Sequence, residues 1–132
     1  MTRRILSLIL TVPLVVAAVF PCNSRAQTPG KEIHRLFLED QRDRKHDLQA
    51  MSEEQQGTWW AGVRQRDSQR RTRTLELLHE NLLSTGQDFE EAAFVFQHGE
   101  TDHYLFARVF ATVALSKGRR NARWIAPATL DR

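Results

Sequence analysis

The sequence predicts an all-α, single-domain protein of about five helices: two long N-terminal helices packed with a C-terminal helical hairpin unit. Two long segments without proline are rich in strong helix formers, and glycines separate the helical segments. No segment alternates apolar and polar residues with a period of two, so no sheet is expected. The roughly one hundred residues that follow the N-terminal segment suffice for one hydrophobic core.

Residues 1–26 have the features of a cleavable export signal in the expected order. Arg3 and Arg4 form a positive n-region, residues 5–20 form an uncharged and mainly apolar core, and residues 24–26 place small residues at the two positions that signal peptidase reads. We therefore expect a mature domain of residues 27–132, exported to the periplasm or beyond.

Two other interpretations of this segment stay open. As an uncleaved anchor, its apolar run is shorter than the roughly 20 residues of a membrane span. As a lipoprotein signal, it has proline instead of a small residue directly before Cys22.

Removal of the signal changes what the composition implies. The chain has 19 Lys+Arg against 16 Asp+Glu, but Arg3, Arg4 and Arg25 belong to the signal, which leaves 16 residues of each sign. The basic pI is therefore no argument for nucleic-acid binding, and we expect no nucleic-acid partner and no membrane partner after cleavage. The single cysteine, Cys22, is also removed, so no disulfide is expected.

The first expected helix covers residues 31–56 and is ended by Gly57. The second covers residues 58–85 and is ended by Gly86, because glycine readily takes the left-handed conformation that follows many helices. Both segments lack proline, which favours long helices.

Three shorter helices are expected in the C-terminal half. Asp88 with Glu91 has the spacing of a capping box and predicts a helix over residues 89–98, ended by Gly99. The next helix is capped by Thr101 or Asp102 and stops at Gly118, and the last begins near Asn121 and is disturbed by Pro127.

Charged residues lie on the apolar face of the first expected helix. On a helical wheel, Asp40 and Arg44 fall within roughly 20° of the centre of the apolar stripe. Their spacing of four residues lets them contact each other. The stripe itself consists of Ile33, Leu36, Phe37, Leu48 and Met51.

The second expected helix repeats this pattern with Asp67 and Arg71. If the two helices pack antiparallel, both carboxylates and both guanidiniums meet in one network. Burial of such charges costs several kcal/mol per ion unless they are paired, so the network either ties helices together or forms a polar cleft. A third interpretation is that both Asp/Arg pairs are exposed to solvent, which applies if the rotational phase assumed for the helices is wrong. The apolar stripe here consists of Trp60, Val63, Leu75, Leu78 and Leu82.

His98 is the main candidate for chemistry in the C-terminal half. It can serve as a general base, as a metal ligand, or as a histidine favoured by the dipole at a helix C-terminus. Asp102 and His103 extend it to a pattern that loosely resembles a metal site, but the spacing crosses a glycine turn. We expect no metal and no cofactor.

Arginines at positions 64, 66, 70, 71 and 73 form a basic run close to Trp59 and Trp60. A nucleic-acid surface is one interpretation. Because the expected mature chain is exported and carries no net charge, a solvated helix face is favoured. The chain also lacks nucleophile-elbow, phosphate-loop and zinc-protease motifs.

Several short motifs together resemble an uncharacterised family of exported bacterial proteins. They are Asp40-Gln41-x-x-Arg44, Asp67, Ala92-Ala93, Gln97-His98-Gly99 and Asp131-Arg132. The resemblance covers nearly all of the expected mature chain and implies no activity. It implies that a smaller set of these residues belongs together: Asp40, Arg44, Asp67, His98, Asp131 and Arg132. Glu100 replaces an expected aspartate, Pro127 interrupts an expected alanine-rich helix, and relatives continue beyond Arg132.

Residues 92–130 also resemble a helical hairpin of the tetratricopeptide or Sel1-like kind, with small alanines at packing positions and Gly99 and Gly118 at the turns. Such repeats bind partners and do no chemistry, but arrays generally need three or more units and one is visible here.

Three functions are compatible with these patterns. The first is a binding or interaction module for an unknown protein or a small anionic ligand, with Arg44, Arg71, Gln97, Asp131 and Arg132 as candidate binding residues. The second is a hydrolase-like enzyme with His98 as general acid/base, Asp40 or Asp67 orienting it, and Arg44 or Arg71 holding an anionic group. The third is a purely structural helical bundle.

Overall fold

The computed structural model describes residues 29–129 and has helices but no strands over that range, which confirms the all-α class. The expected export signal and the candidate residues Asp131 and Arg132 lie outside the described residues. None of the described helices is long and apolar enough to cross a membrane. The elements are α1 (Pro29–Arg44), α2 (Glu53–His79), α3 (Gly86–Phe96), α4 (Thr101–Ser116), a 3-10 helix η1 (Arg120–Trp124) and a short α5 (Ile125–Ala128).

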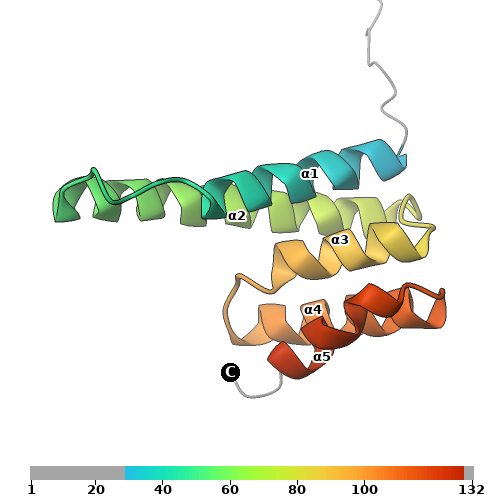
Figure 1. Ribbon diagram of the computed structural model, residues 1–132. Coiled ribbons are helices and arrows are strands. Elements are labelled where there is room, and N and C mark those ends of the chain that lie inside the picture. The colour runs from blue at the N-terminus through green and yellow to red at the C-terminus, as the bar shows by residue number, and fades with distance from the viewer. Residues whose placement is uncertain (1–28, 130–132) are drawn as a thin grey trace, which may run out of the picture.

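Successive helices run antiparallel and lie side by side (Figure 1). Helices α1 and α2 form one hairpin, α3 packs mainly on α1 and α4, and η1 and α5 pack on α4. The α1–α2 loop and the first turns of α2 project beyond the rest of the molecule (Figure 1). This projecting end, the tip of the hairpin, is therefore not covered by the C-terminal helices.

The expected end of the first helix near Gly57 is wrong. Helix α1 ends at Arg44, and α2 begins at Glu53, so Gly57 lies inside α2. The reason is a capping box at Ser52, whose hydroxyl accepts a hydrogen bond from the Gln55 backbone while the Gln55 side chain accepts one from the Ser52 backbone. A good cap outweighs the modest cost of one glycine within a helix.

The end of α2 also differs from the expectation. The helix stops at His79 because Asn81 takes the left-handed conformation, with φ of 57°. Backbone hydrogen bonds from Asn81 to Leu78 and from Leu82 to Leu77 close the end as a Schellman motif. Asparagine tolerates this conformation better than most residues, so it does here what Gly86 was expected to do.

Helix α3 begins earlier than expected because Thr85, not Asp88, is its N-cap. The Thr85 hydroxyl accepts from the Asp88 backbone at 3.1 Å, and Asp88 Oδ2 accepts from the Thr85 backbone at 2.8 Å. Asp88 thus has the N3 role that was expected of Glu91.

The turns that flank α4 depend on two glycines. Its N-cap is Glu100, whereas Thr101 or Asp102 was expected. A Cβ atom on Gly99 would lie 2.3 Å from Cβ of His103, so only glycine fits at the α3–α4 turn. Gly118 has φ of 85° and ends α4 as expected. Pro127 lies within α5, which has only four residues.

The core lies mainly between α3 and α4 and extends to α1. Phe96 and Phe110 are its largest fully buried side chains, and their ring centroids are 5.3 Å apart. Alanines on both helices are fully buried, so the two backbones approach closely at Ala92, Ala93, Ala107, Ala111 and Ala114.

Candidate functional site

The buried face of α2 is partly ionic. Its buried residues follow one another at intervals of four and three, which is the period of a helix seam. This seam differs from the expected stripe, since Leu78 is 37% exposed. The residues of the seam are Val63, Asp67, Arg70, Thr74 and Leu77.

Asp67 joins the two helices of the hairpin. Its Oδ2 accepts a hydrogen bond from Arg44 on α1 at 2.7 Å, and its Oδ1 accepts one from Arg70 at 2.7 Å. Arg44 Nη2 also lies 3.2 Å from Asp40 Oδ1. The expectation that Asp40, Arg44 and Asp67 meet in one network is therefore confirmed.

Asp43 and Arg70 belong to the same network but were not among the candidates. Arg70 donates to Asp43 at 2.6 Å, and Arg66 donates to both oxygens of Asp43. Burial raises the pKa of Asp43, but the hydrogen bonds from Arg66 and Arg70 outweigh it, so the pKa is lowered overall. If the alternating spacing of four and three residues had been counted along the sequence from Val63, it would have predicted that Arg70 is buried with Asp67.

Arg71 is not the partner of Asp67, which corrects the expected Asp67–Arg71 pair. Burial lowers the pKa of Arg71, although the charges of Asp67 and Glu100 oppose this. Its Nη1 atom is buried and has no hydrogen-bond partner among residues 29–129. Arg70 takes the place at Asp67 because it lies on the seam, whereas Arg71 lies one residue further around the helix.

Asp40 is the most deeply buried member of the network. It is 0% exposed, and burial raises its pKa to about 6 even though the nearby Arg44 charge opposes the shift. The neighbouring Asp67 carboxylate raises it further. The carboxyl group therefore titrates close to neutral pH.

His98 extends the network to the surface. Its Nε2 lies 3.7 Å from Oδ2 of Asp40 and 3.3 Å from Nε2 of Gln97. The ring forms part of the wall of a cavity of about 210 Å³, which we call the His98 pocket. Arg44 and Arg71 do not line it. Its residues are Gln97, His98, Trp124, Ala128 and Thr129.

The residues of the loose metal-like pattern do not converge. His103 Nδ1 accepts a hydrogen bond from the Glu100 backbone at 2.9 Å, as part of the α3–α4 turn. Within residues 29–129, no group of three or more His, Cys, Asp or Glu side chains is placed to hold a metal ion. His103 thus has a local role in the turn.

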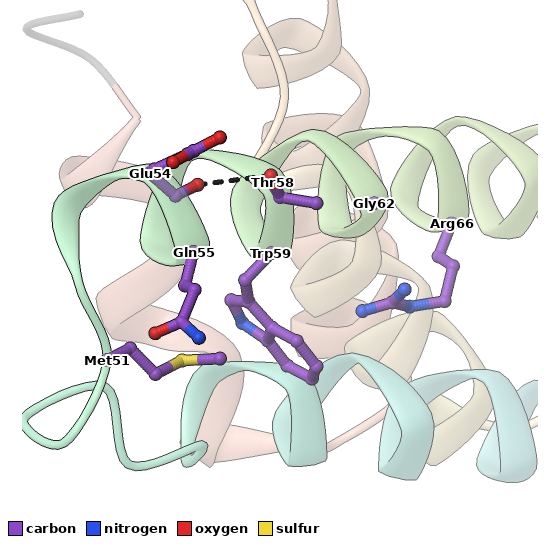
Figure 2. Close-up of a pocket in the computed structure, with 7 residues that line it drawn as sticks. All are labelled: Met51, Glu54, Gln55, Thr58, Trp59, Gly62 and Arg66. Atoms are coloured by element: carbon purple, nitrogen blue, oxygen red, sulfur yellow. Dashed lines mark hydrogen bonds between the residues drawn. The ribbon is translucent and has the colours of Figure 1, made fainter.

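A larger cavity of about 560 Å³, the tip groove, lies along the first turns of α2 (Figure 2). Trp59 forms its apolar wall, a feature that the sequence suggested only as part of a possible nucleic-acid surface. The groove shares no lining residue with the His98 pocket. It is lined by Met51, Glu54, Gln55, Thr58, Trp59, Gly62 and Arg66.

No protein-family model matches the chain, and neither a curated protein nor a solved structure matches it significantly. The resemblances carried by short motifs therefore stay predictions. We infer function from the geometry of the site alone.

Proposed function

We propose that this chain is an exported binding module that takes a small anionic ligand in the His98 pocket. The observation that supports this proposal is the position of His98, which lines the pocket and lies 3.7 Å from the fully buried Asp40. A buried charge held directly behind a surface cavity is typical of functional sites.

The chemistry of the pocket favours an anion. The imidazole of His98, held 3.7 Å from the Asp40 carboxyl, provides a hydrogen-bonding ring at the pocket. The Gln97 amide beside that ring adds a hydrogen-bonding group, and Trp124 adds an apolar surface. At about 210 Å³, the pocket is smaller than the roughly 300 Å³ lower limit of drug-sized sites, which favours a small ligand such as a carboxylate or phosphate group.

The ion network alone does not require His98. Asp67 and Asp43 each have both carboxylate oxygens hydrogen-bonded to arginines of the α1–α2 hairpin. These contacts connect α1 to α2 without any group from α3. A purely structural role therefore accounts for this part of the network but not for the histidine at the pocket.

A hydrolase is the second candidate, and the Asp40–His98 pair is the observation that favours it. In that role Asp40 orients the imidazole, and His98 removes a proton from water as general base. Arg44 and Arg71 do not line the pocket, so neither is placed to hold a substrate there. The binding proposal needs no turnover, and steady consumption of a bound ester or phosphate ester would favour the hydrolase.

The test is an NMR titration of the isotope-labelled full chain with inorganic phosphate and, separately, acetate. We expect saturable shifts of the His98 ring and of the Gln97 and Trp124 side chains at millimolar anion. His98→Gln should weaken binding roughly tenfold, which corresponds to the loss of one charge-assisted hydrogen bond.

His79→Gln is the matched control, because His79 is exposed on α2 and lies outside the pocket. It should leave binding unchanged. In parallel, His98→Ala should change the free energy of unfolding by less than about 1 kcal/mol, as expected for a partly exposed, long ion pair. Absence of saturable shifts would refute the binding proposal, and a loss of about 1–3 kcal/mol would make His98 a structural residue.

A further inference from the structure

The tip groove has a rigid aromatic wall. The ring of Trp59 stacks on His46 of the α1–α2 loop, with 3.9 Å between centroids and 20° between planes. The guanidinium carbon of Arg66 lies 5.1 Å from the Trp59 centroid. Figure 2 shows the indole between Met51 and Gln55 on one side and Arg66 on the other. A ring held in this way offers an apolar surface at little entropic cost.

Arg66 places one hydrogen-bond donor at the groove. Its Nε and Nη2 donate to Asp43 at 3.0 and 3.1 Å, which fixes the plane of the guanidinium. Its Nη1 makes no hydrogen bond to the described residues. A Cβ atom added at Gly62 would lie 3.1 Å from this Nη1. Arg66 Nη1 therefore lies close against Gly62, in space that a side chain at this position would contest.

Arg66 is the cation of the groove lining. The ion network to which it belongs balances three guanidiniums against three carboxylates when Asp40 is ionised. Glu54 lines the groove as well, but twelve residues of helix separate it from Arg66, or about 18 Å along the axis. An anionic group is therefore favoured at the Arg66 end only. The members of the network are Asp40, Asp43, Asp67, Arg44, Arg66 and Arg70.

We propose that the tip groove is a second binding site, for an amphipathic carboxylate. The apolar body of the ligand packs on Trp59 and Met51, and its carboxylate accepts a hydrogen bond from Arg66 Nη1 beside Gly62. The volume of about 560 Å³ lies within the usual range for small-molecule sites. This site is independent of the function proposed for the His98 pocket.

The probe for the test is 4-phenylbutyrate, which joins a phenyl ring to a carboxylate through a short apolar chain. We would titrate it into the ¹⁵N-labelled full chain and follow the three indole N–H signals by NMR. The Trp59 signal should shift in a saturable way, whereas the signals of Trp60 and Trp124, which do not line the groove, should move little. The neutral 4-phenylbutyramide should bind roughly tenfold more weakly.

Two variants test the charge and the shape of the groove. Arg66→Gln should weaken 4-phenylbutyrate binding roughly tenfold and remove the preference over the amide. Gly62→Leu should abolish binding, because its side chain occupies the groove and displaces the Arg66 guanidinium. The matched control is Gly57→Leu, since Gly57 lies on the same helix and a Cβ there meets nothing within 4 Å.

Binding by the Gly57→Leu protein with loss of binding by the Gly62→Leu protein would support the groove, because both substitutions replace glycine within α2 and neither breaks the helix. The proposal is overturned if Trp59 does not respond, if the amide binds as well as the carboxylate, or if Gly62→Leu leaves binding intact. None of these outcomes depends on the His98 pocket, whose residues are unchanged.

Discussion

Asp40 has the least solvated carboxyl group of the ion network. Two charges lie close to its oxygens: Arg44 stabilises the ionised form, and Asp67 destabilises it. Desolvation exceeds both effects and raises the pKa to about 6. The residue is thus a proton-binding group whose state changes just below neutral pH.

The raised pKa of Asp40 predicts a loss of stability as pH rises. Between its ordinary value of 3.8 and about 6, the folded protein binds this proton more tightly than the unfolded chain does. The contribution of Asp40 to the free energy of unfolding should therefore fall by about 2 kcal/mol from pH 4 to pH 6. Asp40→Asn should remove this fall and be at least as stable as the wild type at pH 7.

The measurement is the difference in urea unfolding free energy between wild type and Asp40→Asn at several pH values. The difference cancels groups such as Asp43, whose lowered pKa gives the opposite trend: stability gained as pH rises and complete above its unfolded value. A difference that does not vary with pH would show that Asp40 is not desolvated in the way we describe.

Helix α2 is the element whose boundaries depend most on local caps. Its first turn is held by the Ser52 capping box, and its last by the left-handed Asn81. The first turns of α2 project beyond the rest of the molecule (Figure 1), so intrinsic helix propensity matters more there than in the core. Gly57 lies in this part of the helix.

Gly57→Ala should therefore stabilise the protein by about 0.5–1 kcal/mol, because alanine has the higher helix propensity and no atom lies within 4 Å of the added Cβ. Thermal unfolding of the variant and the wild type measures this. Gly118→Ala provides the contrast: φ of 85° at Gly118 disfavours any side chain, so that variant should melt lower. A destabilising effect of Gly57→Ala would argue against a regular helix at this position.

At the scale of the whole molecule, the structure combines two kinds of helix contact. Polar contacts between arginines and carboxylates join α1 to α2, whereas alanines and phenylalanines join α3 to α4. The His98 pocket lies where α3 meets the C-terminal helices. It is next to the polar contacts between α1 and α2, and the apolar packing of α3 on α4 supports it. Close packing of α3 on α4 therefore holds His98 at a fixed distance from α1.

Overpacking of the α3–α4 contact should be costly. Ala111 is fully buried, and Ala111→Leu adds volume where the two backbones approach closely, which should destabilise the protein by about 1–3 kcal/mol. Thr112→Leu, at the exposed neighbouring position, should change stability by less than about 0.5 kcal/mol. Chemical unfolding of both variants tests this, and equal effects would mean that α3 and α4 do not pack as described.

Local patterns predicted a large part of this arrangement. The absence of a two-residue period predicted the all-α class, and the phase of α1 placed Asp40 and Arg44 on the buried face, where they lie. The end of α4 at Gly118 was predicted because glycine readily takes the positive φ that follows many helices. The errors at Gly57 and Gly86 arose because helix ends depend on which of several competing caps is satisfied, here Ser52, Asn81 and Thr85.

The sequence by itself determined the helical class and the presence of charged residues on two apolar faces, because both depend on periodicity within a single segment. Only the tertiary structure decided which charges meet: it replaced Arg71 with Arg70 at Asp67, brought His98 to Asp40, and opened the tip groove beside Gly62. The physical reason is that ion pairing and cavity shape depend on the distance and rotation between helices. These are set by packing of the whole core, to which residues far apart in the chain contribute.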